Sequence, residues 1–156
     1  MRGAGVFAGY LDAAGVESPV DDAGFLHTGD LGEFDAQGRL RLTGRKSDVF
    51  KTSTGRKIAP TAVEARLKQI AGLDHVVVFG AARKAIVALV TRAPELLPGL
   101  RDADAWREWA RGIARRVSEV TAEDNDYLRP AGVLVHRGAF TIDAGELTSN
   151  LKLRRR

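Results

Sequence analysis

The sequence contains no cysteine, which excludes disulfide bonds, thiolate catalysis and cysteine-bound metals. It also contains no apolar run long enough to cross a bilayer, and its first residues lack the apolar core of a signal peptide. We therefore expect no membrane span. Because disulfides are the mark of oxidising compartments, a chain without them is expected in a reducing cytoplasm.

What the sequence does contain is a globular composition. Of its 156 residues, 44% are hydrophobic and 28% are charged, which is enough to bury a core in one domain, or in one small domain plus a piece of another. The net charge is +4, and residues 154–156 are all arginine. A solvated tail explains these arginines better than a nucleic acid partner. No aromatic–basic interleaving, zinc spacing or recognition-helix pattern accompanies the charge.

The first 43 residues are rich in glycine and aspartate and have short strand-like pieces. Residues 32–34 and 39–43 alternate in character around the turn sequence of residues 35–38, which predicts a β-hairpin. Such a hairpin is expected to bury Phe34, Leu40 and Leu42 on one face. A hairpin of this size is not stable alone.

The character of the chain changes after Arg45. Pro60 at a first helical turn, with apolar residues at helical spacing behind it, predicts a helix in which Glu64 favours the positive end of the helix dipole. The apolar runs 75–79 and 85–90 predict buried strands, an amphipathic pattern from Asp104 predicts a long helix, and residues 133–136 predict a further strand. These elements indicate a small α+β domain with a mixed sheet, residues 46–156, behind a β-rich remnant, residues 1–45.

Three polar segments carry candidate chemistry. In the first, Gly29 lets the chain turn closely between Thr28 and Asp30, so that the carboxylate can accept hydrogen bonds from the vicinal hydroxyls of a ribose. The alternative is a turn aspartate that bonds its own backbone. In the second, Arg45 is a permanently charged fork for hydroxyls or phosphate oxygens, or simply an arginine at a domain boundary.

The second segment continues into a polar turn at residues 52–56. Lys51, Gly55, Arg56 and Lys57 surround this turn, which suits either a phosphate or a polar ligand chain, or a solvated loop. In the third segment Lys152 lies between two leucines, where an ammonium can stabilise negative charge that develops on an α-phosphate. Its alternative is membership of the basic tail. The three histidines are too scattered for a metal site, so no metal ligand is expected in this chain.

Taken together, the three segments resemble the adenylate-forming superfamily of acyl-CoA synthetases, peptide-synthetase adenylation domains and luciferases. The likeness runs nearly the whole length. It is strongest to long-chain fatty acyl-CoA synthetases, which contain Gly-Trp-Leu-His-Thr-Gly-Asp and Gly-Arg-Lys-Lys-(Asp/Glu)…Lys-Thr-Ser-Gly-Gly…Ile-Ala-Pro. Residues 24–30 and 44–60 are similar to these motifs almost position by position.

The resemblance implies a role for each segment. It assigns nucleotide binding to Asp30, Arg45 and Thr28, with the first two on the ribose, and adenylation to Lys152. It assigns the approach to the pantetheine thiol of CoA to a loop of three residues, Lys51, Thr54 and Gly55. Enzymes of this kind join a carboxylate to AMP from ATP with Mg²⁺, release pyrophosphate, and then rotate their C-terminal domain so that CoA attacks.

Two residues depart from the family pattern. The hinge position is usually Asp or Lys and here is Ser47, and the first glycine of the CoA loop is here Thr54. The large N-terminal domain, which in the family holds most of the ATP and Mg²⁺ contacts and the acid pocket, does not precede Met1. We therefore interpret the chain as a C-terminal fragment that is inactive alone and whose first partner is its own N-terminal domain.

The acid that is activated and the oligomeric state are not visible in the sequence. Three functions stay open: a part of an acyl-CoA ligase, an acyl-AMP ligase that loads a carrier protein instead of CoA, and a non-catalytic binding module of the same fold. An enzyme part is favoured over a binding module if Asp30, Arg45 and Lys152 can be brought to a common pocket on an N-terminal domain.

Overall fold

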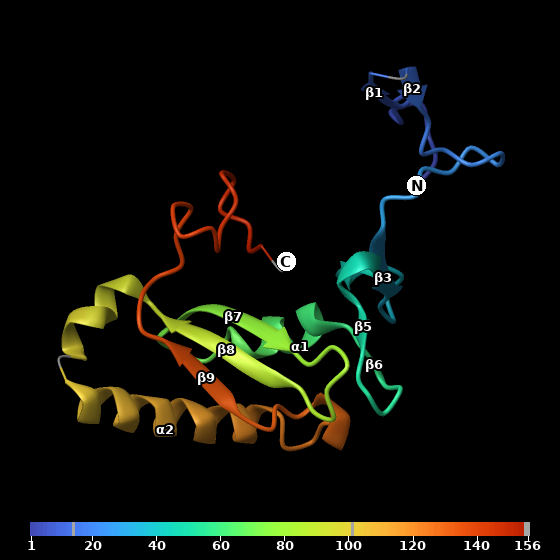
Figure 1. Ribbon diagram of the computed structural model, residues 1–156. Coiled ribbons are helices and arrows are strands. Elements are labelled where there is room, and N and C mark those ends of the chain that lie inside the picture. Colours follow the sequence, from blue (N-terminus) through green and yellow to red (C-terminus); the bar gives the residue numbers. More distant parts are fainter. Residues whose placement is uncertain (14, 101, 155–156) are drawn as a thin grey trace. The chain divides into compact units, whose positions relative to one another are not determined.

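The computed structural model describes residues 1–13, 15–100 and 102–154 (Figure 1). Backbone contacts divide the chain into two units, Met1–Ser47 and Asp48–Arg156. The strands of the first unit are β1 (Tyr10–Asp12), β2 (Gly15–Glu17), β3 (Asp30–Phe34) and β4 (Leu40–Arg45). The elements that follow are a 3-10 helix (Lys46–Asp48), β5 (Phe50–Lys51), β6 (Lys57–Ile58), α1 (Pro60–Leu67), β7 (Leu73–Phe79), β8 (Val87–Arg92), a 3-10 helix (Pro94–Gly99), α2 (Ala103–Val120), a 3-10 helix (Asp126–Leu128) and β9 (Val133–His136).

The predicted hairpin in the first unit is confirmed. Strands β3 and β4 pair antiparallel, with Phe34 opposite Leu40, around a turn in which Asp35 accepts hydrogen bonds on Oδ1 from the backbone N–H groups of Gln37 and Arg39, both at 2.9 Å. The hydrogen bonds to Asp35, first that from the Arg39 backbone, hold the pKa of this carboxyl below its usual value of 3.8.

The predicted burial on this hairpin is wrong. The side chains of Phe34, Leu40 and Leu42 are 74%, 61% and 65% exposed. The strand register does place them on one face, because Phe34 pairs with Leu40 and Gly32 pairs with Leu42. A two-stranded sheet has no second layer of its own, however, so this apolar face is uncovered within the unit.

The second unit is built on a three-stranded sheet in the order β7–β8–β9, and Figure 1 shows it beside α1 and α2. Strands β7 and β8 pair antiparallel, whereas β8 and β9 pair parallel, with Thr91 opposite His136. The parallel step is possible because α2 forms the crossover between the two strands. The prediction of an α+β fold with a small mixed sheet is confirmed.

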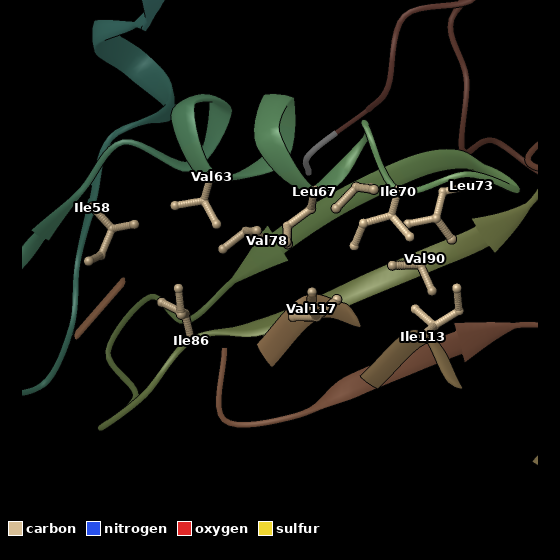
Figure 2. Close-up of a cluster of buried hydrophobic side chains, with 12 residues drawn as sticks. Ile58, Val63, Leu67, Ile70, Leu73, Val78, Ile86, Val90, Ile113 and Val117 are labelled. Atoms are coloured by element: carbon tan, nitrogen blue, oxygen red, sulfur yellow. The ribbon is translucent and has the colours of Figure 1, made fainter. Parts of the chain in front are cut away.

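Both faces of this sheet are covered. One face packs on α1 and α2 through twelve buried side chains, most of which Figure 2 shows, with Ile58, Leu67, Ile86 and Val90 fully enclosed. The other face packs on the chain's last segment, where Phe140 and Leu147 meet Val77 of β7. Burial on both sides explains why these strands have continuous apolar runs and no alternation of apolar and polar residues.

The two helices begin where the sequence indicates. Pro60 is the first residue of α1, and the Asp102 carboxylate caps α2 by accepting hydrogen bonds from the backbone N–H groups of Asp104 and Ala105 at 3.0 and 2.8 Å. On α2, Ile113 and Val117 are buried as the apolar stripe predicts. None of the helices in the described ranges is both long and apolar enough to span a bilayer.

Glu64 has a different role from the predicted one. Its side chain is only 7% exposed, and Oε1 accepts a hydrogen bond from the backbone N–H of Val78 at 2.7 Å. Strand β7 is at the edge of the sheet, so alternate N–H groups along it have no strand partner. Glu64 therefore joins α1 to this edge instead of facing water near the helix N-terminus.

We predict that Glu64→Ala lowers the free energy of unfolding by about 2 kcal/mol, because it leaves the Val78 N–H buried without an acceptor. Glu64→Gln keeps an acceptor oxygen of the same reach, so its loss should be less than half as large. Urea unfolding of the two variants and the parent chain measures the difference. Equal stability of the alanine and glutamine variants would contradict this role.

A second polar link joins α1 to the segment after α2. The Arg66 guanidinium binds both carboxylate oxygens of Asp124, with Nη1 at 2.7 Å from Oδ1. The bonded guanidinium holds the pKa of Asp124 below its usual value of 3.8, and the Asp124 carboxylate raises the pKa of Arg66. Because Arg66 is 40% exposed, solvent screening limits the pair to about 1 kcal/mol.

We predict that Asp124→Asn removes this contribution at neutral pH. The pKa of Asp124 is lower in the folded state than in the unfolded state, so the ion pair stabilises the fold at every pH above the unfolded pKa. This stabilisation is lost as the pH falls through the folded pKa. The difference in unfolding free energy between parent and variant should therefore be constant from neutral pH down to the unfolded pKa and should shrink as the pH falls further through the folded pKa. Urea titrations across this range test the prediction, and a difference that stays constant would contradict it.

Candidate functional site

Thr28, Asp30 and Arg45 form a cluster, the Asp30 cluster, in the first unit. Asp30 begins β3 and Arg45 ends β4, and the two residues are opposite each other in the strand register. Arg45 Nε forms an ion pair with Asp30 Oδ1 at 2.9 Å, and Nη1 donates to the Thr28 carbonyl oxygen at 2.8 Å. The Asp30 N–H donates to Thr28 Oγ1 at 3.1 Å. The structure thus brings together three residues that are up to 17 positions apart.

The backbone at Gly29 makes this arrangement possible. Gly29 has a φ of +73°, a left-handed conformation that costs energy for any residue with a Cβ. Its carbonyl oxygen accepts a hydrogen bond from the Lys46 N–H at 2.7 Å, which closes the turn against the end of β4. The tight turn therefore holds Asp30 facing Arg45.

The Asp30 cluster retains unused hydrogen-bonding capacity. The side chains of Asp30 and Arg45 are 30% and 55% exposed. Among the described residues, Asp30 Oδ2 has no partner. The carboxylate of Asp30 can accept a hydrogen bond from one hydroxyl while the adjacent guanidinium of Arg45 donates to the neighbouring hydroxyl, which suits a vicinal diol. The alternative for the same geometry is a turn that is stabilised by its own ion pair.

Lys51 is the last residue of β5, and Thr54 and Gly55 lie in the short loop that follows it toward β6; residues 51–55 of the second unit are called the Lys51–Gly55 loop. Thr52, which is only 6% exposed, organises this loop. Its Oγ1 accepts from the Arg56 N–H at 3.1 Å and is 2.9 Å from Thr54 Oγ1, and its own N–H donates to the Arg56 carbonyl at 2.9 Å. Gly55 takes a left-handed φ of +81°. The hydroxyl of Thr54, at a position where the family motif has glycine, is thus engaged inside the loop.

A neighbouring loop adds cations that sequence reasoning missed. The Ala82 N–H donates to the Lys51 carbonyl and the Ser53 N–H donates to the Arg83 carbonyl, both at 2.9 Å. These bonds hold Arg83 beside the Lys51–Gly55 loop, although the two are about thirty positions apart in the chain. Among the described residues, neither Lys51 nor Arg83 forms an ion pair. In the sequence, the pair of adjacent cations Arg83 and Lys84 indicates a charged turn. It does not indicate that this turn lies beside the Lys51–Gly55 loop.

We predict that Thr52→Val loosens the Lys51–Gly55 loop, because it removes the acceptor of the Arg56 N–H at a cost of about 1 kcal/mol. Amide hydrogen exchange of Arg56 should then accelerate by about fivefold. Thr54→Val is the matched control, since it leaves Thr52 Oγ1 free to accept from Arg56. Similar acceleration in both variants would show that Thr52 is not the organising residue.

Lys152 lies in a tight turn near the end of the chain, the Lys152 turn, residues 147–153. Leu147 and Leu153 pair across the base of the turn, and the buried Leu147 anchors it to the sheet. The Lys152 carbonyl accepts from the Thr148 N–H at 2.8 Å, while its side chain is exposed. Lys152 is therefore part of an anchored turn and not of a free tail. Residues 155 and 156, the end of the basic tail, lie outside the described residues.

The predicted site residues therefore form separate groups. The Asp30 cluster is in the first unit, the Lys51–Gly55 loop and the Lys152 turn are in the second, and Ser47 lies in the 3-10 helix Lys46–Asp48 at the division between units. Within the described ranges, no three histidine, aspartate or glutamate side chains gather closely enough to hold a metal ion. The described part of the chain offers anion- and hydroxyl-binding groups but no metal-ligand set.

Comparison with known families defines the class of protein. Residues 47–129, more than half of the chain, match the family described as the AMP-binding enzyme C-terminal domain. The chain belongs to this family. The resemblance to adenylate-forming enzymes that the sequence motifs indicate is confirmed.

Individual relatives agree with this assignment. The long-chain-fatty-acid–CoA ligase FadD15 of Mycobacterium tuberculosis is 30% identical over 168 residues, covering 100% of this chain and 28% of FadD15. Long-chain-fatty-acid–CoA ligase 5 of Mus musculus is 30% identical over 169 residues, covering 99% of this chain and 25% of the relative. The chain thus spans about a quarter of the length of the curated relatives it matches.

Solved structures show the same fold. The adenylation domain of the carboxylate reductase from Mycobacterium chelonae is similar with a TM-score of 0.71 and 27% identity, over 87% of this chain and 21% of that one. The adenylation domain of carboxylic acid reductase from Segniliparus rugosus, in complex with AMP and a co-purified carboxylic acid, has a TM-score of 0.70 and 25% identity, over 87% of this chain and 22% of that one.

Proposed function

We propose that this chain is the C-terminal part of an ATP-dependent acyl-CoA ligase. The reaction joins a carboxylate to ATP to give acyl-AMP and pyrophosphate, and the CoA thiol then displaces AMP to give the thioester. The observation that carries the proposal is the alignment of the whole chain, from the Asp30 cluster to the Lys152 turn, with long-chain-fatty-acid–CoA ligases. Residues 1–45 are proposed to end the AMP-binding domain and residues 46–156 to form the mobile C-terminal domain.

Asp30 and Arg45 are proposed to bind the ribose of the nucleotide, and Thr28 is proposed to take part in binding the same nucleotide. The unpartnered oxygen of Asp30 and the exposed guanidinium of Arg45 supply an acceptor and a donor side by side, as two adjacent hydroxyls require. Their mutual ion pair supports this role, because it holds both groups in place before the ligand arrives.

Lys152 is proposed to assist adenylation. Its ammonium is exposed on an anchored turn, and among the described residues it forms no ion pair, so the charge is available for negative charge that develops between a carboxylate and the α-phosphate. Ser47 is proposed as the hinge that lets the second unit present different residues to one nucleotide. Serine lacks the charge that the hinge position usually carries. Ion pairing at the hinge would therefore favour neither of the two orientations of the second unit.

The Lys51–Gly55 loop is proposed to approach CoA. Its backbone is held in shape by Thr52, and the exposed cations Lys51 and Arg83 beside it suit a thiol substrate that carries phosphate groups. Mg²⁺ is proposed to enter with ATP and to bind chiefly to the upstream domain, since the described residues of this chain do not fit a metal. A cytoplasmic location, where ATP and CoA are used together, goes with this proposal.

The upstream AMP-binding domain is the proposed partner of the first unit. The exposed apolar face formed by Phe34, Leu40 and Leu42 supports this assignment, because a row of large apolar side chains is seldom left in water by a monomeric domain. The 156 residues alone are therefore expected to lack activity, because the acid pocket and most of the ATP contacts would lie in that upstream domain.

A second candidate is an acyl-AMP ligase that loads a carrier protein. One observation favours it over a module without catalysis, and another weighs against CoA as the acceptor. The A-PCP didomain of carboxylic acid reductase from Segniliparus rugosus, in complex with AMP, is similar in structure, with a TM-score of 0.69 and 25% identity. Thr54 also adds a branched side chain to the loop that is proposed to approach CoA.

The proposal predicts that the protein extended upstream in its native reading frame catalyses acid-dependent ATP–pyrophosphate exchange, and that the 156-residue chain does not. In the extended protein Lys152→Ala should lower the exchange rate by about 10²–10³-fold, as expected for the loss of one charge-stabilising group in a transition state. Conversion of supplied acyl-AMP and CoA to the thioester should be retained. Lys68→Ala, an exposed lysine on the end of α1, is the matched control and should have no effect.

Three results would contradict the proposal in different ways. No exchange by the extended protein would favour the non-catalytic module. Equal exchange by Lys152→Ala and the parent would remove Lys152 from the mechanism. Exchange with transfer to a phosphopantetheinyl carrier protein but not to CoA would favour the second candidate.

A further inference from the structure

We propose that Thr148 is the positioning residue of Lys152: its hydroxyl and backbone hold the turn that directs the lysine toward the reacting phosphate. This inference rests on the proposed function of Lys152, and its geometric part can be tested without any activity. Thr148 was not singled out by sequence reasoning, because one threonine in a polar segment has no distinctive pattern.

Three hydrogen bonds link Thr148 to the two residues at the tip. Thr148 Oγ1 accepts from the Lys152 N–H at 3.1 Å. The Thr148 N–H donates to the Lys152 carbonyl at 2.8 Å, and the Thr148 carbonyl accepts from the Leu151 N–H at 2.8 Å. Both backbone polar groups of Lys152 are therefore bonded to the same residue, so the position of its Cα depends on Thr148.

The conformation that these bonds hold is a strained one. Leu151 has a φ of +58°, in the left-handed region that glycine adopts freely and that a residue with a Cβ seldom adopts. Its side chain is 67% exposed, so burial of this leucine does not compensate for the strain. Strained residues persist where surrounding bonds hold them, and here those bonds come from Thr148.

Thr148 is itself attached to the core. It follows Leu147, which is 5% exposed and packs on Val77 and Phe140 against the second face of the sheet. On the other side of the turn, the Arg154 N–H donates to the Glu146 carbonyl at 2.9 Å. The half-buried Thr148 thus links the backbone of Lys152 to the sheet, whereas the side chain of Lys152 is exposed.

Hydrogen exchange of the 156-residue chain tests the geometric part. We expect Thr148→Ala to accelerate exchange of the Lys152 amide by about fivefold or more, because the amide loses its acceptor. Thr148→Ser keeps the hydroxyl and should restore protection. Thr141→Ala is the matched control: Thr141 Oγ1 accepts from the Ala144 N–H at 3.0 Å in the same segment, but it does not contact Lys152.

A second substitution separates positioning from general stability. Leu151→Gly removes the strain at φ +58° and should make the turn less dependent on Thr148, so Thr148→Ala should cost less in the glycine background than in the parent. Additive effects of the two substitutions on the exchange rate of the Lys152 amide would contradict the idea that the Thr148 hydroxyl helps to hold Leu151 in its strained conformation.

The functional part requires the protein extended upstream. We expect Thr148→Ala to lower kcat of acid-dependent ATP–pyrophosphate exchange by about tenfold with little change in the KM for ATP, since a displaced group near the reacting atoms affects the transition state more than ground-state binding. Thr148→Ser should recover most of the rate, and Thr141→Ala should match the parent.

Each outcome decides something. Unchanged exchange of the Lys152 amide in Thr148→Ala would overturn the inference. Accelerated amide exchange with an unchanged kcat would leave Thr148 as a structural residue and overturn its positioning role. If the extended parent protein has no exchange activity, the proposed function fails and the positioning role with it, while the hydrogen-exchange result still decides whether Thr148 holds the turn.

Discussion

The second unit depends on a three-stranded sheet that must be covered on both faces. Strands β7 and β8 consist largely of branched apolar residues, and burial of such side chains is the main source of stability in a small domain. Helices α1 and α2 cover one face and the last segment of the chain covers the other. Because Leu147 and Phe140 are needed to complete the second layer, the Lys152 turn is fixed to the sheet as a consequence of core packing.

The same sheet also determines where its loops and polar links lie. Glu64 reaches from α1 to the N–H of Val78 on the unpaired edge of β7, and thereby satisfies a donor that would otherwise be buried without a partner. At the end of the β7–β8 hairpin, backbone hydrogen bonds attach Arg83 to the loop around Thr52. These bonds join two loops that are distant in the chain, and each loop carries an exposed cation, Lys51 or Arg83. The first unit has no comparable core, and its cluster of Asp30 and Arg45 is held by a hairpin register, a tight turn and an ion pair.

Much of the fold could be predicted because its signals are local. The turn sequence beginning at Asp35 identifies a hairpin, Pro60 marks a helix start, and continuous apolar runs mark strands that are buried on both faces. The errors concern the environment of a side chain, which is not local. Leu40 was expected to be buried because an apolar face requires a cover, but the unit supplies none. Glu64 was placed at a helix dipole because its strand partner is 14 residues away.

The sequence by itself determined the family and the chemical groups that its motifs offer. Residue types and their spacing can be read directly from the chain and compared with the motifs of a family. It indicated Asp30, Arg45 and Lys152 as separate candidates. Only the tertiary structure decided which groups meet: that Arg45 pairs with Asp30 across a hairpin, that Thr52 closes the loop after Lys51, and that Thr148 holds both backbone groups of Lys152. The reason is physical. Hydrogen bonds and burial depend on distances between atoms, and a chain acquires those distances only when its layers pack.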